Sequence, residues 1–217
     1  MSAEWPETRE AIAYQTVEGD HLARVAALHG LRAFAAIWEH ADNAPLRKQR
    51  TSPHVLAPGD LVHLPAVRPG VADRQTEQRH RFQAKLSTLR LRVKRQHEDG
   101  TPVTVPPTAV ACDGETVAFT ASAELLDTPI TPITRACSVT APDVDLVLTI
   151  GYLQPVSTVP GFRERLNNLG YRAGDSEDVD TNTMRSAIEE FQCDQGLVVD
   201  GRCGPVTQQR LRAVHGC

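Results

Sequence analysis

Residues 161–171 read GFRERLNNLGY, residues 181–192 read TNTMRSAIEEFQ and residues 200–211 read DGRCGPVTQQRL. Each stretch predicts one helix, because its apolar residues recur three or four positions apart and so fall on one face. These apolar positions are Phe162, Leu166, Leu169, Met184, Ala187, Ile188, Phe191, Leu211 and Val214. The expected caps and stops are Gly170, Asp180 or Thr181, Gly196, and Pro205 as the first residue of the last helix.

The combined pattern (LGY, T, AI, FQ, GL, DG, G, T, L) resembles the peptidoglycan-binding domain found beside bacterial cell-wall enzymes. The resemblance covers about a quarter of the chain and implies a three-helix bundle over residues 157–217. One departure is the acidic turn DSEDVD at residues 175–180, where the family has a Gly-rich turn. The glycan-binding candidates here are Tyr171, Arg172, Asp175 and Gln192. Most signature residues are core or turn positions, so the pattern indicates the fold more strongly than it indicates binding.

Residues 12–65 predict a second unit of strand, helix, helix and strand. IAYQTV at residues 12–17 reads as a strand, and Asp20 is the expected N-cap of a helix that ends at Gly30. A second helix presents Phe34, Ile37 and Trp38 on one face, and a loose polar stretch with Asn43, Arg47 and Arg50 leads to the strand LVHL at residues 61–64.

This order, with VEGDHL at residues 17–22 and LAPGDLVHLP at residues 56–65, resembles a LysM domain. The resemblance implies a βααβ domain over residues 1–66 that holds N-acetylglucosamine-containing glycans in a shallow groove between two loops. Carried over by position, the groove residues are Gly19, Asp20, His21 and Leu22 on one side, and Leu56, Ala57, Pro58 and Gly59 on the other. The alternative is that these glycines, prolines and aspartates are ordinary cap and turn residues.

Residues 67–86 are polar and charged and read as a linker that becomes helical around residues 76–86. After this linker, apolar and charged residues alternate one by one, beginning with LRLRVK at residues 89–94, and this alternation is typical of a half-exposed strand. Five or six short strands separated by turn residues predict a small β-sandwich-like domain over residues 87–156. The expected fold class is therefore α+β and multi-domain.

The N-terminal unit also carries a longer pattern, which resembles the LysM copies in accessory proteins of contractile injection machines, particularly type VI secretion systems. The matching residues are Trp38, Asn43, Leu46, Arg47, Arg50, Pro53, Leu56, Pro58, Gly59 and Asp60. The resemblance implies spike or baseplate proteins as partners.

Composition and charge exclude several classes of protein. The 217-residue chain has a net charge of −4 and 41% hydrophobic residues, and no basic stripe with interleaved aromatics, so we expect no nucleic-acid partner. No apolar run is long enough for a membrane span.

The N-terminus, MSAEWPE, has no apolar segment of the kind found in secretory signals. We therefore expect a cytoplasmic protein, with delivery to the periplasm or cell wall by a non-classical route as the alternative.

The five cysteines form no CxxC pair, and the eight histidines form no HExxH motif, so we expect no metal and no cofactor. An odd cysteine count without a secretory signal favours reduced thiols. A bridge between Cys193 and Cys203 is the alternative to two small buried side chains.

No catalytic motif emerges from the sequence. Glu164, Glu189 and Glu190 fall on expected solvent faces of helices rather than in a carboxylate pair, and no GxSxG or activated cysteine motif is present. We expect a non-enzyme. The leading hypothesis is a peptidoglycan-binding accessory protein of a type VI-like injection system, and the alternative is a cytoplasmic adaptor that uses the same folds for protein contacts.

Overall fold

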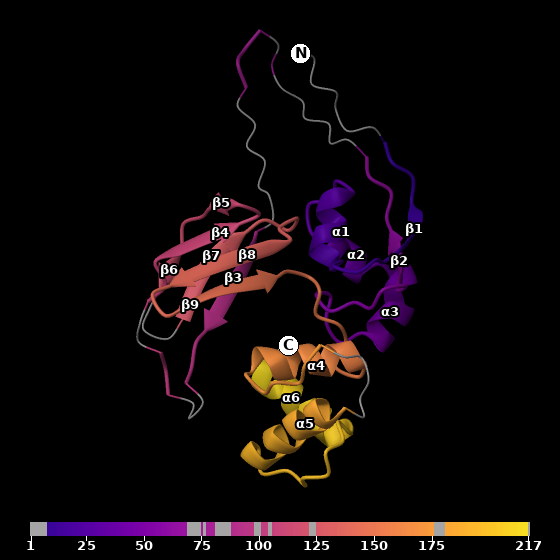
Figure 1. Ribbon diagram of the computed structural model, residues 1–217. Helices are drawn as coiled ribbons and strands as arrows, with labels where there is room; N and C mark the ends of the chain where they lie inside the picture. Colours follow the sequence, from indigo (N-terminus) through magenta and orange to yellow (C-terminus); the bar gives the residue numbers. More distant parts are fainter. Residues whose placement is uncertain are drawn as a thin grey trace.

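The computed structural model describes residues 8–68, 75, 77–80, 88–97, 101–103, 106–121, 125–175 and 181–216. It contains both helices and β-sheets, which confirms the α+β class. The elements form a group of helices with a two-stranded sheet, a group of strands, and three C-terminal helices. Figure 1 shows these groups in space. The sequence-based predictions for residues 1–7, for the acidic turn after residue 175 and for most of the helix at residues 76–86 lie outside the described residues.

The N-terminal unit has helices inserted between two paired strands. Strands β1 (Ile12–Gln15) and β2 (Leu61–Leu64) are antiparallel, with Tyr14 opposite Val62. Between them lie α1 (Leu22–Leu28), α2 (Ala35–Trp38), the 3₁₀ helix η1 (Ala41–Asn43) and α3 (Ala44–Gln49). Their shared core consists of Leu22, Val25, Ala26, Ile37, Leu46, Leu56, Val62 and Leu64.

The stretch predicted as loose and polar is instead helical and firmly tied to the core. Asn43 is buried, and its Nδ2 donates to the carbonyl oxygens of Ile37 and His63, each at 2.8 Å. Its Oδ1 accepts the His63 N–H at 2.8 Å. Arg50 forms two 2.7 Å hydrogen bonds to the carboxylate of Asp60. These long-range bonds satisfy buried polar groups, so residues that look like a solvated loop in sequence fix η1 and α3 against β2.

The middle unit consists of two antiparallel sheets around one core. One sheet has the order β3 (Leu89–Lys94), β7 (Leu125–Ile130), β6 (Thr120–Ala121). The other has the order β5 (Glu115–Thr116), β4 (Ala109–Cys112), β8 (Ala136–Ala141), β9 (Val144–Thr149). Buried side chains from β4, β7 and β8 meet between the sheets. Strand β7 contains Pro129, which pairs with Arg90 of β3 and has no paired residue on its other side among the described strands.

Cys112 and Cys137 form a disulfide between the neighbouring strands β4 and β8. This corrects the prediction that all cysteines are reduced. The two residues lie directly opposite each other in the register, which brings their Cα atoms to 4.1 Å. Cys193 and Cys203 are free thiols, and burial raises the pKa of Cys203 to about 12.

The C-terminal unit is formed by α4 (Val159–Asn168), α5 (Asn182–Asp194) and α6 (Pro205–His215). The Thr181 hydroxyl accepts the Met184 N–H, so Thr181 is the N-cap of α5, and Pro205 begins α6, as predicted. The apolar faces share a core of Phe162, Leu166, Ala173, Met184, Ala187, Ile188, Phe191 and Leu211. Val214 was expected in this core but is 40% exposed at the end of α6.

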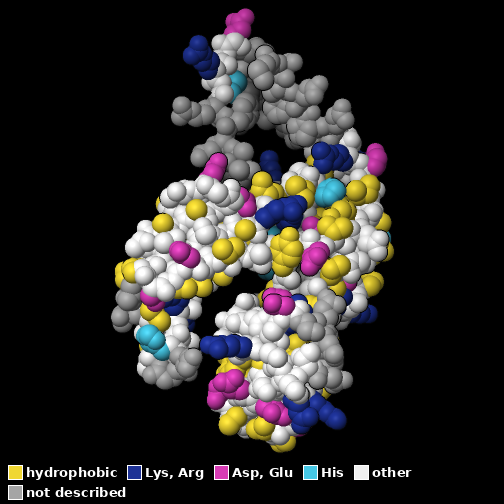
Figure 2. Space-filling view, in the orientation of Figure 1, with side chains coloured by type: hydrophobic (Ala, Val, Ile, Leu, Met, Phe, Trp, Pro, Cys, Tyr) yellow, Lys and Arg dark blue, Asp and Glu magenta, His cyan; other side chains and the backbone are white. Residues whose placement is uncertain are grey.

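None of the helices in the described part of the chain is long and apolar enough to cross a membrane. Figure 2 shows acidic and basic side chains interspersed over one face of the molecule.

Candidate functional site

The turn at residues 17–20, which forms one wall of the predicted groove, is organised by the buried carboxylate of Asp20. Asp20 Oδ2 accepts the hydroxyl of Tyr14 at 2.6 Å and the N–H of Val17 at 3.0 Å. Its Oδ1 lies 3.7 Å from Nε of Arg24. Burial and the bond to Asp20 raise the pKa of Tyr14 to about 12. The predicted cap role of Asp20 is wrong: His21 is the N-cap of α1, and its Nδ1 accepts the Arg24 N–H.

Much of this wall faces protein rather than solvent. His21 and Leu22 are buried, and a Cβ placed at Gly19 would lie 3.2 Å from the ring of Tyr152. Nε2 of His21 is buried without a hydrogen-bond partner among the described residues. Burial is the main cause that lowers the pKa of His21 to about 4, and interactions with His54 and Arg24 add to it.

The opposite wall of the predicted groove contains both buried and exposed residues. Leu56 is a core residue, and the carbonyl oxygen of Ala57 accepts the Thr16 hydroxyl at 2.6 Å. Pro58 and Gly59 are exposed. Glycan binding between the two loops stays a prediction.

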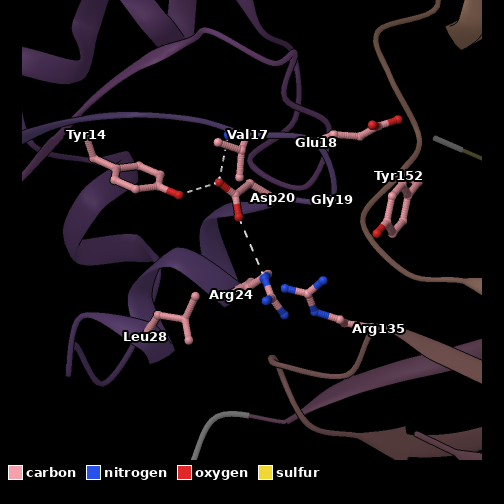
Figure 3. Close-up of a pocket in the computed structure, with 9 residues that line it drawn as sticks. All are labelled: Tyr14, Val17, Glu18, Gly19, Asp20, Arg24, Leu28, Arg135 and Tyr152. Carbon is pink, nitrogen blue, oxygen red and sulfur yellow. Dashed lines mark hydrogen bonds and ion pairs between the residues drawn. The ribbon is translucent and has the colours of Figure 1, made fainter.

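A hollow of about 180 Å³, which we name the Tyr152 hollow, lies between the N-terminal and middle units (Figure 3). Gly19 and Asp20 line it together with Arg24, Arg135 and Tyr152. In Figure 3 the guanidinium groups of Arg24 and Arg135 lie close together, and Tyr152 stands across from the turn. Arg24 also donates to the carbonyl oxygen of Ile133 at 2.9 Å, which ties α1 to the middle unit. A balanced set of acids, guanidinium groups and an aromatic ring is suited to the hydroxyl groups of a neutral sugar.

Two of the four C-terminal candidates have internal roles. Gln192 is 2% exposed, and its Oε1 accepts the N–H groups of Asp200 and Gly201, each at 3.0 Å. Its Nε2 donates to the Asp200 carboxylate at 2.8 Å and to the Thr207 hydroxyl at 3.1 Å. Gln192 therefore holds the turn before α6 in place.

Tyr171 packs edge-on against Phe191, and its hydroxyl donates to Asp194 at 3.0 Å. Burial and this bond raise the pKa of Tyr171 to about 12. Arg172 and Asp175 are exposed, and of these two only the Asp175 backbone has a described contact, accepting from Arg163 at 3.0 Å. The side chains of Arg172 and Asp175 are thus the C-terminal candidates that face solvent.

A second hollow, of about 280 Å³, lies between the end of α3 and the C-terminal helices. We name it the Arg212 hollow. Residues 49–52 and 155–157 line it together with Arg165 of α4 and with Pro205, Gln208, Gln209 and Arg212 of α6. The sequence predicted a binding role for Gly19 and Asp20 of the Tyr152 hollow but for none of the residues of the Arg212 hollow, because each hollow brings together residues from units that are far apart in the chain.

Among the described residues no group of three or more His, Cys, Asp or Glu side chains is placed to hold a metal ion. Glu164 pairs with the half-buried Arg163, and Glu189 pairs with the exposed Arg185.

Comparison with known proteins identifies one region of the chain. No curated protein and no solved structure matches the chain. Residues 157–211 match the family model described as "Putative peptidoglycan binding domain". This range contains α4, α5 and most of α6, so the C-terminal helical unit of this protein is similar to a peptidoglycan-binding domain.

Proposed function

We propose that this protein is a non-catalytic peptidoglycan-binding protein and that its C-terminal three-helix unit contacts the polymer. The family match over residues 157–211 is the observation that carries the proposal. The helix caps, the turn held by Gln192 and the shared core support it, since the signature residues hold three helices together as one unit.

The exposed side chains of Arg172 and Asp175, in the segment after α4, are the proposed contact surface of this unit. A guanidinium group can donate several hydrogen bonds to glycan hydroxyls, acetamido oxygens or peptide carbonyls. Tyr171 and Gln192 keep that segment and the turn before α6 in place rather than binding ligand themselves.

Co-sedimentation of the full chain with purified sacculi tests the proposal. The wild type is expected to pellet with sacculi, and Arg172→Ala is expected to pellet less. Arg210→Ala is the matched control, because Arg210 is an exposed arginine on α6 that bonds only to Gln195 among the described residues. A wild-type protein that stays in the supernatant at all sacculus concentrations would exclude peptidoglycan binding. Release of soluble fragments from sacculi would contradict the non-catalytic assignment.

The N-terminal unit is proposed as a LysM-like second contact with the glycan. Its observed order of strand, helices and strand and the Tyr152 hollow support this proposal. Two weak sites on one chain would gain from effective concentration. Pelleting should therefore weaken when Tyr152→Ala removes the aromatic side of the hollow.

The second candidate function is an adaptor of a contractile injection system that contacts baseplate or spike proteins without binding glycan. The contact of Gly19 and His21 with the segment at residues 151–152 favours it, because that segment covers part of the predicted glycan groove. The motif that suggested the injection system consists partly of fold-stabilising residues, including Asn43, Arg50 and Asp60. Pull-down of sheath, tube or spike proteins by a chain that fails to pellet with sacculi would select this alternative.

A further inference from the structure

The Arg212 hollow differs in charge from the rest of the molecule. The whole chain carries a net charge of −4, yet the described residues that line this hollow include three arginines and no Asp or Glu. The arginines come from three places: Arg50 follows α3, Arg165 belongs to α4 and Arg212 belongs to α6. Hydroxyl and amide side chains, such as Ser52, Ser157, Gln208 and Gln209, make up much of the remaining lining.

One face of α6 is directed into the hollow. Pro205, Gln208, Gln209 and Arg212 are spaced by three and four residues, so they lie on the same side of the helix. Leu211 and Thr207 are buried on a different side, against the other helices. Apart from Pro205, the side that faces the hollow is therefore occupied by polar side chains, and none of its residues belongs to the core cluster of the C-terminal unit.

The three arginines differ in how many hydrogen bonds their guanidinium groups make within the protein. Arg50 is held by its paired 2.7 Å bonds to Asp60, which fixes its position and offsets its charge. Arg165 is almost fully buried and donates to the carbonyl oxygens of Gln154 and Gly161. Arg212 is exposed, and the described contact of its side chain is one long bond of 3.4 Å to the Thr51 hydroxyl across the hollow. Most of the hydrogen-bonding capacity of the Arg212 guanidinium group is thus directed to solvent within the hollow.

We propose that the Arg212 hollow binds a carboxylate group of the peptidoglycan stem peptide, with Arg212 as its main ligand. This inference rests on the proposed function, because peptidoglycan presents its negative charge on the carboxylates of its short peptides. Arginine forms paired, charge-assisted hydrogen bonds to carboxylates. The volume of about 280 Å³ lies just below the roughly 300–1,000 Å³ of typical ligand pockets, so the hollow takes a terminal peptide group rather than a whole repeat unit. The site requires both the N-terminal and the C-terminal unit, and it lies apart from Arg172 and Asp175.

Calorimetric titration of the full chain tests this with acetyl-D-alanyl-D-alanine and with the C-terminal amide of the same dipeptide. The wild type is expected to bind the acid about tenfold or more tightly than the amide, since bonds to a charged group contribute about 1.5–3 kcal/mol. Arg212→Gln is expected to bind both equally weakly. Arg210→Gln, two residues away on another side of the same helix and outside the hollow, is expected to keep the preference. The unfolding midpoints of both variants are measured, and Arg212→Lys shows whether a point charge suffices.

Equal affinity of the wild type for acid and amide would overturn the proposal, as would an Arg212→Gln variant that keeps the preference. Inorganic phosphate that competes as well as the dipeptide acid would overturn the assignment to the stem peptide. The same preparations are tested for pelleting with sacculi. Normal pelleting without discrimination between acid and amide would reject this inference alone, whereas absence of pelleting would reject the proposed function as well.

Discussion

Gly151 lies against the backbone of Gly19: a Cβ added at position 151 would stand 2.5 Å from the Gly19 carbonyl oxygen and 2.9 Å from Cδ2 of His21. The backbone at Gly151 also has a φ of +89°, which side chains of L-residues rarely adopt. These two glycines bring the end of the middle unit onto the turn of the N-terminal unit, next to the Tyr152 hollow. The contact therefore positions Tyr152 and links two units that are distant in sequence.

Gly151→Ala is expected to break this contact and push the end of the middle unit away from the turn at Gly19. The matched control is Gly114→Ala, which has a similar φ of +85° but would place its Cβ in open space. The control should lose about 1–2 kcal/mol of unfolding free energy from backbone strain alone. Gly151→Ala should lose at least twice as much and should enlarge the radius of gyration in small-angle scattering. Equal losses for the two variants, with no change in size, would show that the contact does not hold the units together.

His21 is expected to make the protein less stable in acid. The ordinary pKa of 6.5 falls to about 4 in the folded state, chiefly because the ring is buried, with His54 and Arg24 adding to the effect and Asp20 opposing it. Above pH 6.5 both folded and unfolded states are neutral at this residue. Below pH 6.5 the unfolded chain gains a proton that the folded ring does not accept until about pH 4, so stability falls over that window by about 3 kcal/mol.

His21→Asn isolates this contribution, because asparagine keeps an N-cap acceptor and does not titrate. The stability advantage of the wild type over this variant should shrink as the pH is lowered from 7 to 4, as measured by denaturant unfolding. His29 and His215 also have lowered pKa values, and they contribute equally to both proteins. A difference that stays constant with pH would contradict the assignment to His21.

Gln192 and Arg172 should respond differently to replacement. Gln192→Ala removes the bonds that hold Asp200, Gly201 and Thr207, and it is expected to cost about 2–4 kcal/mol of stability because buried polar groups lose their partners. Arg172→Ala is expected to change stability by less than about 0.5 kcal/mol, since the side chain is exposed. Thermal unfolding monitored by circular dichroism measures both. A stable Gln192→Ala variant that fails to bind sacculi would return Gln192 to the role of a ligand-binding residue.

The Cys112–Cys137 disulfide should stabilise the middle unit. The bond closes a loop with a sequence separation of 25, for which loop entropy predicts about 3 kcal/mol. Reductant should lower the unfolding midpoint of the wild type and leave a Cys112→Ser/Cys137→Ser protein unchanged. Cys193→Ser is the control, because Cys193 is an exposed free thiol. Titration of all five cysteines as free thiols in the native protein would contradict the bond.

Local spacing in the sequence was sufficient to predict the C-terminal helices. Thr181 caps α5, Pro205 begins α6 and Leu211 is fully buried, as the pattern of apolar and capping residues indicated. These features depend on residues a few positions apart, so they can be read from the chain directly. The errors arose where a side chain has a distant partner. Asn43 and Arg50 look like loop residues until β2 and Asp60 are placed beside them.

The sequence by itself therefore determined the three C-terminal helices, the class of the fold and the similarity of residues 157–211 to a peptidoglycan-binding domain. Only the tertiary structure decided that Gly19 faces Tyr152, that Cys112 bonds to Cys137 and that Arg212 reaches toward Thr51. The physical reason is that helix formation and capping are governed by neighbours within a turn or two of chain. Contacts between units depend instead on which finished surfaces meet, and no local pattern of residues encodes that.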